Sequence, residues 1–198
     1  MTISARIPRA DLGGLSWPRL VLLLVPAWWT LRWFPSLSVW CFLDYVNLAF
    51  HEAGHIVFRL GGELLTVLGG TLMQLLVPIV LVVYFLVRQR QPFGSALCLW
   101  WLGESLANVS RYMADARALE LPIVGGGEHD WTDLFYRFGL LSEPAVKGIS
   151  GGTHLLGVGI MLLGLVWGVF FVLPGALQGR IRDAVESRIP ILAVALEP

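Results

Sequence analysis

The chain has 198 residues, of which 56% are hydrophobic and only 14% are charged. A soluble domain carries roughly a quarter charged residues, so this composition argues against an ordinary soluble protein and predicts an integral membrane protein embedded in the lipid bilayer. Basic and acidic residues balance to a formal net charge of zero, which leaves no basic surface of the kind that binds nucleic acid.

Five apolar segments follow one another along the chain, each close to the ~20 residues that cross a bilayer as a helix. They cover residues 17–34, 37–60, 71–87, 93–119 and 155–173, with a glycine-rich polar loop between the last two and a tail over 174–198. The residues before the first segment lack the pattern of a cleaved signal, so we expect that segment to be a retained anchor. The sequence predicts one all-α domain over 1–198, a polytopic membrane protein of about five transmembrane helices.

The second segment contains His-Glu-Ala-Gly-His at residues 51–55, which is an HExxH motif. On a helix, residues i and i+4 lie on one face, so His51 and His55 can bind one Zn²⁺. The alternative is a pair of histidines hydrogen-bonded within the helix bundle. Because ionisable groups at membrane depth are costly unless they are paired or bound to a metal, we favour metal ligation.

Glu52 lies between the two histidines, where it can take a proton from a metal-bound water. We predict that it is the catalytic general base. The alternative is a structural carboxylate in an ion pair with Arg59 or Arg111.

Two of the predicted helices each carry a single polar stripe at helical spacing. The stripe of the second segment contains Asp44, Asn47, His51, Glu52, His55 and Arg59, and that of the fourth contains Glu104, Asn108, Arg111 and Asp115. Since lipid disfavours both stripes, we expect them to face each other inside the protein.

A catalytic zinc usually has three protein ligands and one open position, so a third ligand is needed. Asp115 is the first candidate because alternately crossing helices bring it to the face where the motif lies; an i,i+4 ion pair with Arg111 is its alternative role. His129 in the glycine-rich loop is the second candidate, with Asp130 as a carboxylate that could orient it. Glu104 is the third candidate, and at 1.5 Å per residue it is expected about 15 Å deeper in the membrane than Asp115.

Two further features lie near the predicted site. Gly69 and Gly70 are expected at the mouth of the third segment, either as turn residues or as backbone that hydrogen-bonds an extended substrate strand. His154, at the start of the fifth segment, is expected to support the site rather than to bind metal.

These residues together resemble the site-2 protease group, intramembrane zinc metalloproteases of the M50 type. The resemblance rests on the HExxH motif in a membrane helix, followed by Gly61-Gly62 and Gly69-Gly70. It implies a multi-pass protein of the cell membrane, the inner membrane in a bacterium, that cuts transmembrane or membrane-associated protein substrates. It also implies zinc bound by the motif histidines and by Asp115, although the Tyr-Met-Ala-Asp-Ala context of Asp115 departs from the family's Asp-Gly pattern.

Two other functions fit the same motif. One is a metal-dependent membrane hydrolase that acts on a lipid or a small-molecule amide. The other is a non-catalytic metal-binding or transport protein. The third and fifth segments lack charge, so no polar path reaches both faces, which disfavours transport. The intact Glu52 disfavours a non-catalytic protein.

Overall fold

The structure, a computed structural model, describes residues 14–36, 40–122, 124, 128–189 and 194–196. Over these residues the chain is helical and contains no strand, which confirms the predicted all-α class. The helices are α1 (Trp17–Trp33), α2 (Phe42–Phe58), α3 (Glu63–Val83), α4 (Pro92–Ala114), α5 (Asp130–Arg137), α6 (Glu143–Phe170) and α7 (Gly175–Glu186). The predicted glycine run at 125–127 lies outside the described residues.

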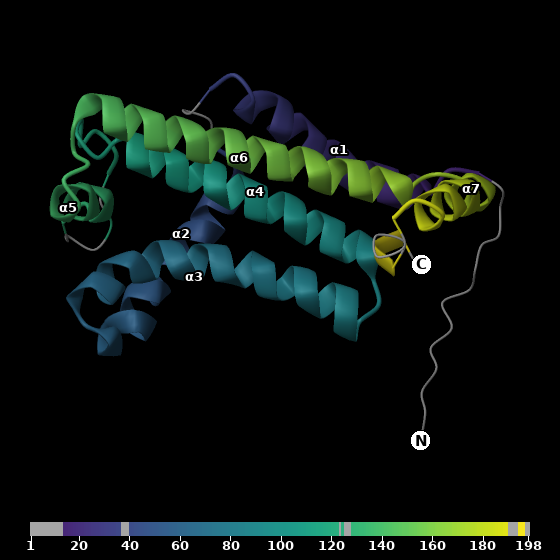
Figure 1. Cartoon of the computed structure of the whole chain (residues 1–198), viewed down its shortest axis with the longest axis horizontal. Helices are drawn as coiled ribbons and strands as arrows, with labels where there is room; N and C mark the ends of the chain where they lie inside the picture. The colour runs from purple at the N-terminus through teal and green to yellow at the C-terminus, as the bar shows by residue number, and fades with distance from the viewer. Residues whose placement is uncertain (1–13, 37–39, 123, 125–127, 190–193, 197–198) are drawn as a thin grey trace.

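The long helices α3, α4 and α6 run along the longest axis of the molecule (Figure 1). The largest contact between helices is that of α4 with α6, and α1 packs against α6. Glycines allow the α4–α6 contact: a Cβ on Gly103 would lie 2.5 Å from the Gly157 carbonyl oxygen, and one on Gly164 would lie 2.7 Å from the Trp100 nitrogen. Small residues at such positions let membrane helices approach closely.

α2 packs chiefly on α3, through a second pair of glycines. A Cβ on Gly69 would lie 2.7 Å from the Gly54 carbonyl oxygen, and one on Gly54 would overlap the Gly69 carbonyl oxygen. Gly69 and Gly70 therefore lie inside α3, which begins at Glu63 rather than at residue 71 as predicted. The prediction of a free backbone edge for substrate at this position is wrong, because these peptide groups belong to a helix.

The boundaries around the long loop also differ from those predicted. α4 ends at Ala114 instead of continuing to 119, and Leu119 has left-handed backbone geometry with φ of 53°. α6 begins at Glu143, twelve residues before the predicted start at 155. The loop between them contains α5, whose eight residues are too few for the periodicity of the sequence to reveal.

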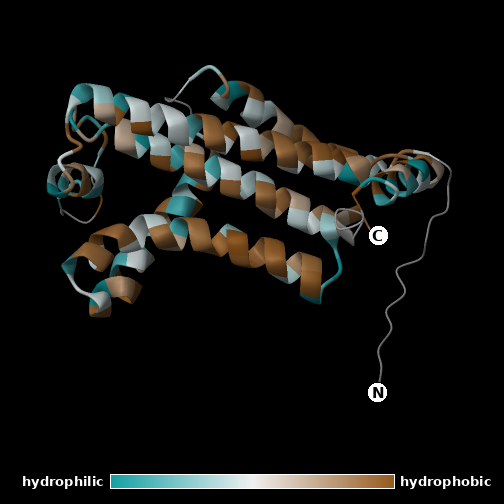
Figure 2. Cartoon of the chain, viewed as in Figure 1, coloured by the Kyte–Doolittle hydropathy of each residue, from teal (hydrophilic) through white to brown (hydrophobic). Residues whose placement is uncertain are grey.

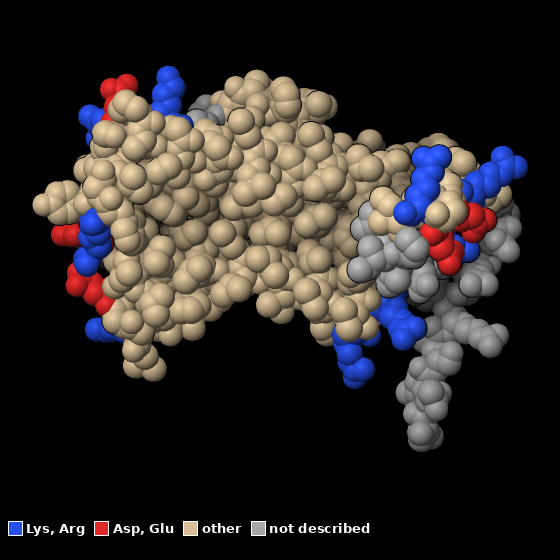
Figure 3. Space-filling model, viewed as in Figure 1, with Lys and Arg blue, Asp and Glu red and all other residues tan. Residues whose placement is uncertain are grey.

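The outer surface has the character expected next to lipid. Large hydrophobic side chains are exposed on the long helices, for example Val25 on α1, Ile56 on α2, Val80 on α3 and Val166 on α6. Figure 2 shows hydrophobic residues along most of α3 and α6. On the face that Figure 3 shows, the charged side chains gather at the two ends of the molecule and the surface between them is uncharged.

Two of the described helices, Glu63–Arg88 and Glu143–Phe170, are long and apolar enough to cross a membrane. They correspond to the third and fifth predicted segments. The other three predicted spans, over α1, α2 and α4, are not both long and apolar enough by the same measure.

Candidate metal centre

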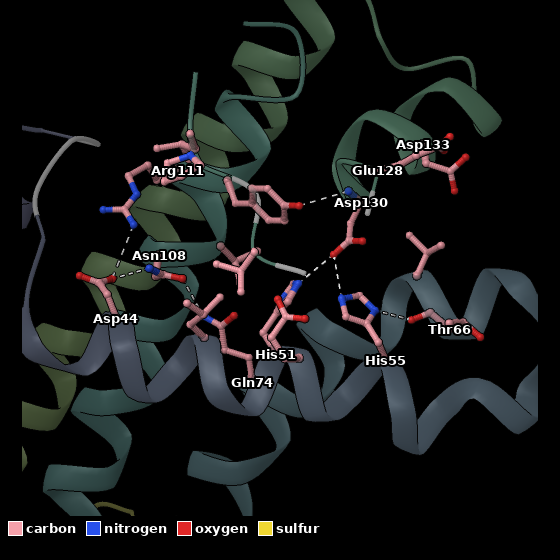
Figure 4. A pocket seen from close by; sticks show the side chains of 18 of the residues that line it. Asp44, His51, His55, Thr66, Gln74, Asn108, Arg111, Glu128, Asp130 and Asp133 are labelled. Atoms are coloured by element: carbon pink, nitrogen blue, oxygen red, sulfur yellow. Dashed lines mark hydrogen bonds and ion pairs between the residues drawn. The ribbon is translucent and has the colours of Figure 1, made fainter. Parts of the chain in front are cut away.

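The two motif histidines lie on one face of α2, with ring centroids 4.8 Å apart. The carboxylate of Asp130, the first residue of α5, reaches both of them (Figure 4). Its Oδ2 lies 2.8 Å from His51 Nε2 and 3.3 Å from His55 Nε2. Two imidazole nitrogens and one carboxylate oxygen thus converge on a single point.

The tautomer of His55 is set by the backbone of α3. His55 Nδ1 lies 2.8 Å from the carbonyl oxygen of Thr66, which can only accept a hydrogen bond, so Nδ1 carries the proton. Nε2, which faces Asp130, is then the ring nitrogen that would bind a cation in place of a proton. Histidine ligands of metals are commonly oriented in this way by a carbonyl or carboxylate on the other ring nitrogen.

Gly70 makes room for both rings. A Cβ at this position would lie 2.6 Å from His51 Nε2 and 2.7 Å from His55 Nε2. Any larger residue would collide with the atoms that face Asp130. The second glycine of the α3 pair is therefore part of the site, although it is far from the motif in sequence.

These three donors fit a zinc ion. The ligand atoms of His51, His55 and Asp130 all lie within 4.8 Å of one another. In a tetrahedral site with bonds of about 2.0–2.1 Å, neighbouring ligand atoms are about 3.3 Å apart, close to the two observed separations. Three protein ligands of this type, with a fourth position facing a cavity, are typical of catalytic rather than structural zinc.

A cap and several contacts with α3, α4 and α6 hold α5, and with it Asp130, in place. His129 caps α5 by accepting a hydrogen bond from the Thr132 nitrogen at Nδ1, and the Asp130 nitrogen donates to the Tyr112 hydroxyl at 3.2 Å. Phe135 is buried in a cluster with Val109, Met113 and Ala116 of the α4 end and Val146 of α6. Arg137 also bridges Asp133 to Glu63 at the start of α3.

The environment keeps Asp130 ionised. Burial would raise the pKa of this carboxyl group, but the hydrogen bonds from His51 and His55 outweigh it, so the pKa of Asp130 lies below its usual range. An ionised carboxylate is the form that binds a metal.

Asp115, the first candidate for the third ligand, does not reach the histidines. It follows the last residue of α4, and its carboxylate accepts hydrogen bonds from the backbone nitrogens of Glu120 and Leu121. Its Oδ2 lies 3.4 Å from His129 Nε2. Because α4 ends earlier than predicted, Asp115 organises the following loop instead of facing α2. Its alternative pairing with Arg111 is also absent among the described residues.

His129 and Glu104 are also placed elsewhere. His129 is buried between Tyr112 and Asp115, where burial lowers the pKa of its imidazole despite the nearby carboxylates. Glu104 is fully buried and accepts a hydrogen bond from Asn47 at 2.8 Å. The structure therefore brings together His51, His55 and Asp130. The sequence had predicted Asp130 only as a residue that orients His129.

The fourth histidine of the chain lies away from this centre. His154 is buried on α6, and its ring lies 6.3 Å from that of Trp33 at the end of α1. Its expected role beside the site is not seen; it packs between α6 and α1.

The two polar stripes meet as expected. Asn108 on α4 donates to Asp44 on α2 and accepts from Gln74 of α3 at 2.9 Å. Arg111 lies 3.9 Å from Asp44, and its guanidinium group is 3.7 Å from the centre of the Trp40 ring. Asp44, Asn108 and Arg111 of the two stripes are therefore joined by hydrogen bonds and an ion pair inside the helix bundle.

A cavity of about 380 Å³ lies between α2, α3, α4 and α5. The metal centre is at one part of its wall, and Asp44 and Arg111 are at another. Glu52 also lines it, half-buried, and forms no hydrogen bond or ion pair among the residues that the structure describes. The predicted alternatives, ion pairs with Arg59 or Arg111, are not formed. Glu52 thus presents a carboxylate to the same space as the two histidines.

No protein-family model, curated protein or solved structure matches the chain.

Proposed function

We propose that the chain is a membrane-embedded zinc metallopeptidase that hydrolyses a peptide bond in a membrane-associated substrate. The observation that supports this most directly is the convergence of His51, His55 and Asp130 in a cavity that Glu52 also lines. Each of these residues matches a role in the chemistry of the HExxH motif.

The roles of the residues follow from their positions. His51, His55 and Asp130 would hold the zinc ion, which when bound supplies Lewis acidity toward a carbonyl oxygen and a water of lowered pKa. Glu52 takes the proton of the attacking water and returns it to the nitrogen of the leaving amine. The Thr66 carbonyl keeps the His55 ring in the orientation in which Nε2 faces the site.

We also propose that α1, α2, α3, α4 and α6 all cross the bilayer. α1 and α2 have 17 residues each, about 25 Å at 1.5 Å per residue, which is close to the ~30 Å hydrocarbon core. α4 carries Glu104 and Arg111, but both are buried inside the bundle, as intramembrane charges usually are. The charged ends in Figure 3 would then lie at the two membrane surfaces.

A non-peptide substrate would use the same centre, so the test must identify the bond that is cut. The purified protein should contain one zinc per chain. Cells that produce the wild-type chain should contain new protein N-termini in membrane segments, detected by N-terminal labelling and mass spectrometry. Cells that produce Glu52→Gln should lack them while the variant keeps its zinc. A metal-free wild type, or identical N-termini with both chains, would refute the proposal.

A further inference from the structure

Tyr112 lies on α4 at the boundary between the metal centre and the cavity. Its ring contacts His51 edge to face, with centroids 5.7 Å apart, and packs against His129 at a tilt of 39° with centroids 4.1 Å apart. The residue lines the cavity together with Glu52. Contacts on two sides therefore hold the ring, and its hydroxyl lies beside a proposed metal ligand.

The Tyr112 hydroxyl accepts a hydrogen bond, which leaves its own proton available. The Asp130 backbone nitrogen donates to the Tyr112 oxygen, so the phenol acts there as an acceptor. A phenol has one proton to donate in addition, and no acceptor for it is found among the described residues. Two nearby side-chain amides, by contrast, already donate to other residues: Gln74 donates to Asn108, and Asn108 donates to Asp44.

We propose that the Tyr112 hydroxyl donates a hydrogen bond to the substrate carbonyl oxygen as negative charge develops on it. This inference rests on the proposed hydrolase function. Donors that are already fixed in place beside a developing oxyanion are a large source of rate enhancement, because they need no reorganisation during the reaction. Tyr112 meets this condition since its ring is in contact with two histidines, His51 and His129.

The step conserves atoms and charge. The water oxygen forms a bond to the carbonyl carbon, and the π pair of the carbonyl moves onto its oxygen, which accepts the hydrogen bond from Tyr112. Tyr112 keeps its proton throughout. When the π bond forms again, the bond from carbon to nitrogen breaks, and Glu52 delivers to the nitrogen the proton that it took from water.

The test uses two small probes of a zinc-loaded protein in detergent micelles, with affinities measured by titration calorimetry. Acetohydroxamate presents an anionic oxygen that can accept from the hydroxyl, whereas imidazole binds through nitrogen and offers no acceptor. Tyr112→Phe should weaken acetohydroxamate binding roughly ten- to a hundredfold, as expected for a hydrogen bond to a charged group. Its effect on the affinities for zinc and imidazole should be much smaller, and it should come only from the lost acceptor of the Asp130 nitrogen. The exposed Tyr45 on α2 provides the control Tyr45→Phe, which should change none of them.

The possible outcomes are distinct. If Tyr112→Phe weakens the binding of both probes equally, Tyr112 acts only by holding Asp130, and the inference is overturned. Unchanged acetohydroxamate affinity also overturns it, but leaves the proposed function intact. A wild type that binds no zinc would refute the proposed function and this inference together.

A second measurement covers the case in which Tyr112→Phe does not fold. The chain has four tyrosines, so the Cζ carbon of each can be followed by NMR after ¹³C labelling of tyrosine in the wild type. The Tyr112 signal should shift on addition of acetohydroxamate and much less with imidazole. Equal shifts with the two probes would contradict the donor role.

Discussion

Asp130 Oδ2 lies 2.8 Å from His51 Nε2, although 79 residues separate the two in the chain. One partner is on a long helix of the bundle, and the other is the first residue of a short helix outside it. The candidate centre is therefore assembled from two separate parts of the chain, and its integrity depends on how α5 is docked.

Removal of Asp130 should abolish high-affinity zinc binding. We expect Asp130→Ala to raise the zinc Kd by more than about a hundredfold, since the loss of even an indirect partner of a ligand costs 10–100-fold. Asp183→Ala is the control, because Asp183 is exposed on α7 and does not line the cavity. Competition with a chromogenic chelator measures the Kd. If Asp115→Ala raised the zinc Kd and Asp130→Ala did not, the third ligand would be Asp115, as the sequence predicted.

Gly70→Ala should weaken zinc binding without unfolding the bundle. The added methyl group would press on the Nε2 atoms of both histidines, so at least one ring must turn away. Gly159→Ala on α6 is the control, since a Cβ there meets nothing within 4 Å. We expect this control to bind zinc like the wild type. Equal zinc affinities for the two variants would show that the rings are not confined by Gly70.

Phe135→Ala should detach α5 from the end of α4. Truncation of a buried phenylalanine costs about 3–5 kcal/mol, and here the loss falls on the cluster that docks α5. Zinc affinity should fall with it, while the helix content measured by circular dichroism stays near that of the wild type. The neighbouring Tyr136 is exposed, so Tyr136→Ala should have neither effect. Retention of full zinc affinity by Phe135→Ala would mean that other contacts suffice to place Asp130.

Glu104→Gln should keep its zinc, because Glu104 hydrogen-bonds to Asn47 instead of facing the motif histidines. Glu104→Ala should also keep it but lower the free energy of unfolding by about 1–3 kcal/mol, since a buried donor on Asn47 loses its acceptor. Metal analysis and thermal unfolding in detergent check the two effects separately. Loss of zinc in the glutamine variant would assign Glu104 to the metal.

The helices of this fold could be predicted from the sequence, because the length of an apolar segment and the helical spacing of its polar residues depend only on residues close together in the chain. These two features predicted the all-α class, the shared face of His51 and His55, and the meeting of the two polar stripes. The third donor was not accessible in the same way. Its position depends on where α4 ends and on an eight-residue helix docked by Phe135, which no periodic pattern encodes. The sequence indicates Asp130 only as a carboxylate that could orient His129.

The placement of Gly69 and Gly70 shows the same limit. Paired glycines usually mark turns, and that prediction ignored the α2 backbone that packs against them. Here the packing of α2 against α3 outweighs the local preference of glycine for turns, and α3 therefore begins at Glu63.

The docking of α5 has a consequence for biosynthesis. A nascent chain that has inserted only as far as α4 already contains both imidazoles and the glutamate of the motif. It lacks Asp130, which emerges from the ribosome later, and Val146 of α6, against which α5 settles. The three proposed zinc ligands would thus come together only after α6 is in place, which would delay the proposed hydrolytic activity until the bundle is complete.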